Sequence, residues 1–201
     1  MPARLGIAAG ALGAMKRSLQ DLSRWAGRRA IAGGPLAANP QARAEAAELV
    51  AACAACDALV QLTARLADGP GAPAEAYLAC KAIVPELAFT ACDRTMQLLG
   101  GRGYIEPNGV AQRFRDLRLL RIFEGPTETL VGHMGTLALG KPRGLRTLLA
   151  THAGRPDVAE ACFAALAGLP RDAEPAWLDL QAGALALAAV LWAVAPDDAW
   201  G

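Results

Sequence analysis

The sequence has no excess of charge of either sign and few aromatic residues. Its 20 Lys and Arg residues nearly balance its 19 Asp and Glu residues, which leaves a formal net charge of +1. Nucleic-acid binders and proteins that bind anionic membranes usually carry a basic excess, so the composition argues against both kinds of partner. Aromatic residues make up 5% of the 201 residues, whereas 54% are hydrophobic and 19% are charged. These values exclude a disordered tail and indicate one domain, or one domain plus an appendage.

Strand patterns are also missing, and alanine is the commonest residue. No stretch alternates between apolar and polar side chains as a half-buried strand does. Alanine is the best helix former and is depleted in strands. The sequence therefore predicts an all-α fold whose core forms by close approach of small side chains.

The five cysteines and two histidines do not indicate a disulfide framework or a metal site. An odd number of cysteines within apolar runs is typical of reduced thiols in a cytoplasmic protein. Cys53 and Cys56 have the spacing of metal ligands, but a zinc site needs a second pair or histidines at similar spacing. His133 and His152 are far from each other in the sequence. We therefore expect buried thiols, no metal and a cytoplasmic location.

Two apolar segments could be mistaken for targeting or membrane signals. Residues 1–15 superficially resemble a signal peptide, but the helical pattern continues through Lys16 and Arg17 as far as Trp25. The uncharged run 180–195 is shorter than the roughly 20 residues that a spanning helix needs. We expect one amphipathic helix at the N-terminus and a buried or partner-facing helix at 180–195, with contact to a membrane surface as the alternative. No transmembrane segment is expected.

Glycine and proline divide the chain into helices. The expected helices cover residues 5–28, 40–67, 74–99, 107–120 and 126–139, followed by weaker helical patterns at 144–152, 156–168 and 174–194. Asn39 is the expected N-cap of the second helix with Pro40 at its first position, and Pro85 is expected to kink the third. The pattern predicts an antiparallel four-helix bundle in residues 1–140 and a helical C-terminal extension in residues 141–201.

A glycine motif, Gly-Gly-Arg-Gly at 100–103, is expected to form a loop after the third helix. The motif lacks a glycine of the dinucleotide fingerprint and follows a helix, so it fails as a Rossmann signal. Backbone without Cβ atoms can still approach a flat or charged ligand closely, and Gln97 one turn upstream supplies an amide that donates and accepts. A plain glycine cap of the helix is the alternative.

Basic residues cluster in the sequence QRFRDLRLLR at 112–121. Such patches can bind nucleic acid, but Asp116 interrupts this one and its leucines mark the buried side of a helix. We therefore expect a solvated helix face whose charges pair with one another.

Glu124 is the strongest candidate for chemistry. It follows the apolar Ile122 and Phe123 and precedes Gly125 and Pro126, which predicts a carboxylate on a turn at a helix N-terminus. Apolar surroundings raise the pKa of a carboxyl toward neutral pH, as a general base requires. A carboxylate at a helix N-terminus can equally act as a cap.

In order and spacing, three motifs resemble the C-terminal helical domain of the acyl-CoA dehydrogenases. These motifs are QLLGGRGY at 97–104, RDLR at 115–118 and IFEG at 122–125. The opening of that domain is similar to Arg4 with AAGALG at 8–13, and its flavin-contacting turn is similar to WAGRR at 25–29 with GGPL at 33–36. The likeness covers residues 4–139 and leaves the remainder unexplained.

The resemblance implies a flavin-dependent α,β-dehydrogenation of an acyl-CoA thioester. Glu124 matches the family's catalytic base, which removes the α-proton, and Gly125 matches a residue that contacts the substrate. Hydride then leaves the β-carbon for the flavin.

The resemblance also implies a flavin adenine dinucleotide (FAD) site shared between subunits. FAD would lie between this bundle and a middle β-domain, with its far end held by the bundle of a neighbouring subunit. The residues that match these positions fall into two sets. Arg29, Gln97, Gly100 and Gly101 match the positions that reach the neighbour's cofactor, and Thr127 and Glu128 match the segment that touches the subunit's own.

Several positions depart from the family pattern. Pro126 replaces a usual hydroxyl residue, Ala32 a usual aromatic and Pro40 a usual glutamine. The sequence has no counterpart of the family's N-terminal helical and middle β-domains, so we expect a homo- or hetero-oligomer in which another chain supplies them. The isolated chain is expected neither to hold flavin tightly nor to turn over substrate. A non-catalytic structural subunit, and a regulatory module acting through 180–195, are the alternatives.

Overall fold

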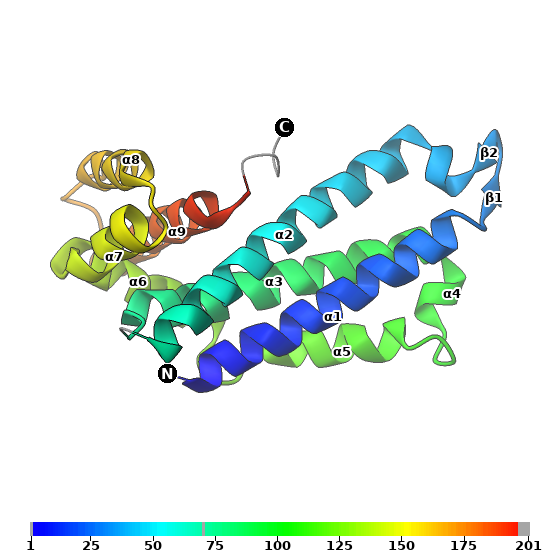
Figure 1. Cartoon of the computed structure of the whole chain (residues 1–201), viewed down its shortest axis with the longest axis horizontal. Coiled ribbons are helices and arrows are strands. Elements are labelled where there is room, and N and C mark those ends of the chain that lie inside the picture. The colour runs from blue at the N-terminus through cyan, green and yellow to red at the C-terminus, as the bar shows by residue number, and fades with distance from the viewer. Residues whose placement is uncertain (1, 70, 197–201) are drawn as a thin grey trace.

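The protein, described here by a computed structural model over residues 2–69 and 71–196, is built almost entirely of helices (Figure 1). Three long helices and one shorter helix lie side by side and alternate in direction along the chain. They are α1 (Pro2–Ala26), α2 (Pro40–Asp68), α3 (Ala74–Leu99) and α5 (Val110–Leu120). The expected antiparallel bundle is confirmed.

The boundaries of the long helices follow from local chemistry. The Asn39 side chain accepts a hydrogen bond from the backbone N–H of Ala42 at 3.0 Å, and Pro40 occupies the first turn of α2, as expected. Helix α3 continues through the buried Pro85 without interruption. Proline has no N–H, so the carbonyl of Lys81, four residues earlier, loses its usual helical donor.

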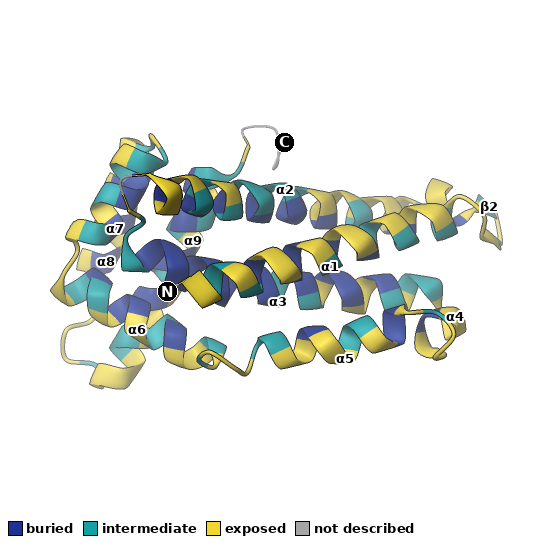
Figure 2. Cartoon of the chain, turned by 60° about the horizontal axis from the view of Figure 1, so that its bottom comes forward, coloured by how far each residue is buried: buried dark blue, intermediate teal, exposed yellow. Residues whose placement is uncertain are grey.

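Helices α1 and α3 pack through small side chains. Ala11 of α1 and Ala91 of α3 are completely buried, and the Thr95 hydroxyl donates to the backbone carbonyl of Ser18 at 3.4 Å. The buried faces of the bundle helices turn toward one another, while their outer faces are exposed (Figure 2). The expectation of a core formed by small side chains is confirmed at this interface.

The connection between α1 and α2 corrects the expectation that the chain has no strand. Strands β1 (Ala30–Ile31) and β2 (Gly34–Pro35) pair antiparallel, and a 3-10 turn (Leu36–Ala38) leads into α2. Gly33 and Gly34 have φ angles of 97° and 130°, which glycine adopts at little cost in so tight a return. Strands of two residues are too short to show alternation, so no pattern predicted them.

Two boundaries after α3 also differ from the expectation. The segment expected as a loop contains one helical turn, α4 (Gly101–Tyr104), and α5 begins at Val110. Gly100, with φ at 62°, ends α3, and its carbonyl accepts from the N–H of Gly103 at 2.8 Å, which closes the new turn. Residues 107–109 are Pro-Asn-Gly, three turn formers that delay the start of α5.

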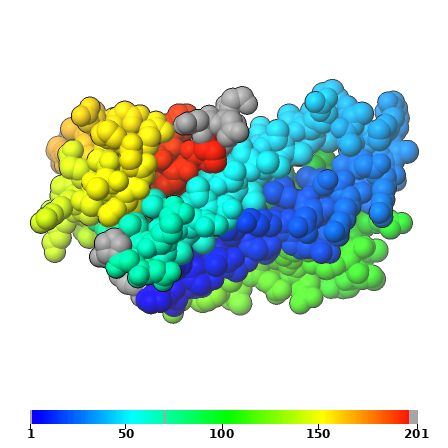
Figure 3. All heavy atoms as spheres, viewed as in Figure 1, coloured from blue at the N-terminus to red at the C-terminus, as the bar shows by residue number. Residues whose placement is uncertain are grey.

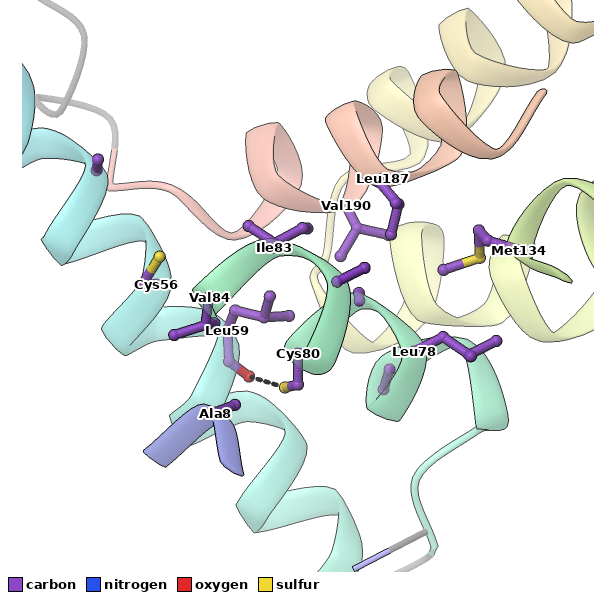
Figure 4. Packing of buried hydrophobic residues seen from close by; sticks show 14 of the residues in the cluster. Ala8, Cys56, Leu59, Leu78, Cys80, Ile83, Val84, Met134, Leu187 and Val190 are labelled. Carbon is purple, nitrogen blue, oxygen red and sulfur yellow. Dashed lines mark hydrogen bonds between the residues drawn. The ribbon is translucent and has the colours of Figure 1, made fainter. Parts of the chain in front are cut away.

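The C-terminal extension forms further helices at one end of the molecule (Figure 1, Figure 3). The bundle region of residues 1–140 ends with α6 (Thr127–Gly140). The extension contains α7 (Arg143–Thr147), a π-helical turn (Leu148–His152), α8 (Pro156–Ala167) and α9 (Pro175–Val194). Leu187 and Val190 of α9 belong to the same hydrophobic cluster as Leu59 of α2 and Ile83 of α3 (Figure 4). The extension therefore shares one continuous core with the bundle.

Helices α2 and α9 are long and apolar enough to cross a membrane by length and composition. Half of the apolar window of α2 and 28% of that of α9 are buried within the fold. Core helices of soluble proteins pass the same test, so these two helices are weak evidence for a membrane span. The run 180–195 lies mainly in α9, where Val190 is buried and Trp192 is 53% exposed.

Candidate functional site

The residues that the sequence singles out lie at opposite ends of the bundle (Figure 1). Residues 124–128 form the turn between α5 and α6 and the first positions of α6. Arg29, Gln97 and residues 100–101 lie at the other end, near β1 and α4. Lys81 of α3 contacts the turn at 124–128, and Gln97 lies near the other end of the same helix. At a rise of about 1.5 Å per residue, about 24 Å of helix separates these two residues.

Glu124 has an unusual backbone conformation. Its φ of 58° makes it the one non-glycine residue with a positive φ in the described part of the chain, and its side chain is exposed. A left-handed conformation at a residue with a Cβ costs on the order of 1–3 kcal/mol, and such strain clusters at functional sites. Gly125 follows with φ at 107°, and a Cβ there would come within 2.9 Å of Leu130. The turn therefore requires glycine at 125 and presents the Glu124 carboxylate to solvent.

Lys81 supports this turn from inside the protein. Its side chain is completely buried in α3, and its Nζ donates to the carbonyl oxygen of Gly125 at 2.9 Å. Burial lowers the pKa of Lys81, whereas the nearby carboxylates of Glu86 and Glu124 oppose that shift. Sequence reasoning missed this residue, although a single lysine within the apolar run ACKAIV is a visible signal.

Glu86 holds the same turn at a second point. Its carboxylate accepts from the Thr127 hydroxyl at 2.7 Å and forms an ion pair with Arg121, whose Nε lies 2.7 Å from Oε1. The Arg121 guanidinium also lies over the ring of Phe89, 4.8 Å from its centroid. Because the Thr127 hydroxyl proton is used by Glu86, only its lone pairs are left for a ligand. Glu128 is exposed in the first turn of α6.

We expected the charges of segment 112–121 to pair with one another, but the ion pairs of its arginines lie outside this segment. Three ion pairs reach other elements: Arg113 with Asp21 of α1, Arg115 with Glu106 of the preceding turn, and Arg121 with Glu86 of α3. Because α5 packs against α1 and α3, Asp21 and Glu86 on those helices lie within ion-pair distance of Arg113 and Arg121. The cluster therefore fastens α5 to the bundle.

At the other end of the bundle, Arg29, Gln97, Gly100 and Gly101 are all exposed. In residues 2–69 and 71–196, neither the Arg29 guanidinium nor the Gln97 amide has a hydrogen bond or an ion pair within the chain. The Arg29 guanidinium lies 5.9 Å from the centroid of the Trp25 ring. Unused donors and acceptors at an exposed surface suit a polar ligand that would satisfy them.

The glycines of the motif at 100–103 have different structural reasons. Gly100 needs its φ of 62° to end α3. A Cβ on Gly103 would lie 2.6 Å from the carbonyl oxygen of Met96, so the packing of α4 on α3 requires glycine there. Gly101 has neither constraint, because its φ is not positive and a Cβ would meet nothing within 4 Å. Open space at Gly101 leaves room for a ligand to approach the backbone.

The five cysteines are free and buried, as expected. Burial raises the pKa of Cys56 to about 12 and that of Cys80 to about 11, which makes both poor nucleophiles and poor metal ligands. Among the described residues, no three His, Cys, Asp or Glu side chains come together as a metal site would require.

Comparison with known proteins identifies relatives of the bundle. Residues 1–138 match the family model of the acyl-CoA dehydrogenase C-terminal domain. The mitochondrial short-chain specific acyl-CoA dehydrogenase of Bos taurus is 28% identical over 135 residues, which are 65% of this chain and 33% of that protein. The crystal structure of a glutaryl-CoA dehydrogenase from Mycobacterium smegmatis in complex with FADH2 has a TM-score of 0.66 at 25% identity, over 69% of this chain and 36% of that one.

The likeness of fold extends beyond the bundle. An acyl-CoA dehydrogenase from Bacillus anthracis, solved in complex with FAD, has a TM-score of 0.73 over 94% of this chain and 40% of that one, at 19% identity. The C-terminal extension therefore also has a counterpart in a solved fold. The chain spans between 33% and 40% of the length of these relatives.

Proposed function

Since the chain belongs to the acyl-CoA dehydrogenase family, which it matches through the C-terminal domain, we propose that it is the helical part of an enzyme that dehydrogenates an acyl-CoA thioester between its α- and β-carbons. The observation that carries the proposal is Glu124, an exposed carboxylate in a left-handed conformation on a turn that α3 holds at two points. The fold provides the position, and the residue type provides the chemistry.

Glu124 is the proposed catalytic base. Its carboxylate takes the α-proton of the thioester, and a base must lie within hydrogen-bond reach of the proton that it removes. A glutamate on an exposed tight turn can approach a substrate bound over that turn. Gly125, which matches a substrate-contacting position of the family, follows it directly. Ile122 and Phe123, which are 49% and 39% exposed, supply apolar surface beside the carboxylate.

The chain's residues fit an FAD cofactor at both ends of the bundle. At one end, Arg29 and Gln97 would hold the pyrophosphate and adenosine of a cofactor bound chiefly by another subunit, with the backbone at 100–101 approaching it closely. At the other end, Thr127 and Glu128 lie next to the proposed base. When bound, FAD supplies the acceptor for the hydride that leaves the β-carbon.

The proposed activity requires parts beyond this bundle. The matched segment is 33% of the bovine relative, so that relative is about three times as long. We therefore propose that the chain acts in a homo- or hetero-oligomer with a chain or domain that supplies the remaining regions. In this proposal, residues 2–196 contribute the catalytic base, one face of the substrate site and polar contacts to the cofactor.

The test is turnover by the complex that forms when the chain is co-purified with its flavoprotein partner. Flavin reduction by acyl-CoA is followed in a single turnover, and Glu124→Gln is expected to slow it by a factor of about 10² to 10⁴. Glu160→Gln, an exposed glutamate of α8, is the matched control and should change nothing. Turnover by Glu124→Gln at the rate of the unmodified complex would refute the assignment of the base.

A second candidate, a non-catalytic structural subunit, rests on the positions that depart from the family. Ala32, Pro40 and Pro126 replace residues that usually serve the cofactor, and the Thr127 hydroxyl proton is engaged by Glu86. Flavin affinity of the complex that does not change with Arg29→Ala and Gln97→Ala would favour this candidate. A loss of affinity in both variants would favour the enzyme.

A further inference from the structure

Lys81 supports the turn that carries Glu124, but it is not among the residues proposed to act on substrate or cofactor, and its environment is unusual. Its exposed fraction is 0%, and it lies in a stretch of α3 where Ala79, Ala82 and Val84 are also buried. The hydrogen bond from its Nζ to the carbonyl oxygen of Gly125 joins residues 44 positions apart in the chain. Lys81 therefore occupies a position in α3 whose buried neighbours along the helix are apolar.

Stability alone does not explain a lysine at this position. Desolvation of an ammonium group costs several kcal/mol, and replacing buried charges by apolar residues of similar volume is often neutral or stabilising. The cation is compensated in part by Glu86 and Glu124, while Arg4 on α1 adds a like charge. Something other than core packing is needed to account for the cation.

The hydrogen bond acts on the backbone of the turn that carries Glu124. The carbonyl of Pro126 accepts from the N–H of Leu130 within α6, but the carbonyl of Gly125 precedes the helix and finds its donor in Lys81. Fixing this carbonyl fixes the plane of the peptide between Gly125 and Pro126. Proline holds its own φ near −65°, so the peptide on the C-terminal side of the turn has little freedom left.

The strained residue precedes this fixed peptide directly. Glu124, at φ 58°, would relax to a right-handed or extended conformation if the turn were free, because the left-handed region is unfavourable for a residue with a Cβ. The Lys81 hydrogen bond and the Glu86 bond to Thr127 oppose this relaxation at successive points of the turn. Hydrogen bonds that involve a charged group are stronger than neutral ones, so these two bonds are suited to balance the strain.

We propose that Lys81 is a positioning residue for Glu124, holding the left-handed turn through the Gly125 carbonyl so that the carboxylate keeps one orientation toward the substrate. This inference rests on the proposed function, in which Glu124 is the base. The inference has a structural part, in which Lys81 fixes the turn, and a catalytic part, in which the fixed turn orients Glu124. The structural part does not depend on the enzyme's activity and can be measured on the chain alone.

The first test uses the full chain without any partner. Lys81→Met keeps the length and apolar stem of the side chain and removes its charge and donors. Amide hydrogen exchange in the peptide 122–130 is expected to become about tenfold faster in this variant, with no change in the exchange of α1. Lys16→Met, which removes an exposed lysine paired with Asp57, is the control and should leave the peptide 122–130 as it was. Unchanged exchange in Lys81→Met would overturn the proposal.

A direct measurement covers the case in which Lys81→Met does not fold. In the unmodified chain, NMR should detect a scalar coupling through the hydrogen bond between the Lys81 Nζ and the carbonyl carbon of Gly125. Absence of the coupling, with the Lys81 ammonium resonance resolved, would contradict the proposal.

The second test uses the assembled complex and separates the two hypotheses. If Glu124→Gln abolishes turnover, Lys81→Met should lower kcat about 100-fold with KM within about twofold, because a displacement of about 1 Å in a catalytic group can cost that much. Full kcat in Lys81→Met beside an inactive Glu124→Gln would refute the positioning role alone. Full turnover in Glu124→Gln would refute the proposed base, and with it the catalytic part of the Lys81 proposal, whereas the exchange experiment would still decide the structural part.

Discussion

Gly135 of α6 lies so close to Asp179 of α9 that a Cβ atom on the glycine would overlap the Asp179 carbonyl. Gly183 of α9 stands in the same relation to the carbonyl of Val131 on α6. The two glycines therefore let the helices cross at backbone contact. This crossing joins the C-terminal extension to the segment that follows the candidate catalytic turn.

Glycine-to-alanine substitutions in α6 and α9 should show whether close packing or helix propensity decides the effect of each glycine on stability. Gly135→Ala and Gly183→Ala are each expected to lower the free energy of unfolding by about 2–3 kcal/mol, because the clash is with backbone atoms that cannot rotate away. Gly132→Ala is the control on the same helix, since a Cβ there meets only Leu180 at 3.9 Å. It should raise stability by up to about 1 kcal/mol through propensity. Urea denaturation measures all three, and equal effects would contradict the account.

The glycine motif at 100–103 should respond differently at two of its positions. Gly103→Ala is expected to destabilise the fold by about 2 kcal/mol, because the new Cβ would press on the Met96 carbonyl. Gly101→Ala should leave thermal stability unchanged and weaken flavin binding by the assembled complex. A loss of stability in Gly101→Ala, measured by circular dichroism, would mean that the fold and not a ligand requires this glycine.

The cysteines should be unreactive in the native protein. Burial raises the pKa of Cys56 to about 12 and that of Cys80 to about 11, so the thiolate fraction at pH 8 is negligible at both. Ellman's reagent is expected to modify none of the five thiols at pH 8 until denaturant is added, and then all five. Rapid modification of any cysteine before unfolding would contradict the packing described for the core.

Asp157 provides a pH-dependent test of the extension. The hydrogen bond from the Arg155 guanidinium holds the pKa of Asp157 at about 2, below its ordinary 3.8. A depressed carboxyl pKa favours the folded state above the ordinary value, and the contribution is lost as the pH falls through about 2. Carbon-13 NMR of the side-chain carboxyl should give a midpoint near 2, and Arg155→Met should return it toward 3.8. A midpoint that does not move in the variant would show that the pair is not formed.

Local chemistry is what the sequence reveals best. The Asn39 cap, the first-turn Pro40 and the break before α3 are each decided by a few neighbouring residues, and the expected bundle follows from them. Glu124 is found the same way, because its turn is marked by glycine and proline. The strands β1 and β2 and the short helix α4 were missed, since elements of two to four residues carry no periodicity.

Contacts between distant segments are what the sequence does not reveal. The bonds from Lys81 to Gly125 and from Thr127 to Glu86 depend on how α6 docks against α3, and each joins residues more than 40 positions apart. The same holds for Arg113 of α5 and for Arg121 directly after it, whose partners lie on α1 and α3. A candidate base can therefore be proposed from a motif, but the contacts that hold its turn in place cannot.

In the proposed reaction, Glu124 removes the α-proton of an acyl-CoA substrate. The most direct measurement is exchange of that proton with solvent deuterium, followed by NMR of a bound thioester that cannot be oxidised at its β-carbon, in the assembled complex. We expect exchange in the unmodified complex, exchange slower by a factor of at least about 100 in Glu124→Gln, and no change in the Glu160→Gln control. Exchange at the same rate in Glu124→Gln would contradict the proposed role of Glu124.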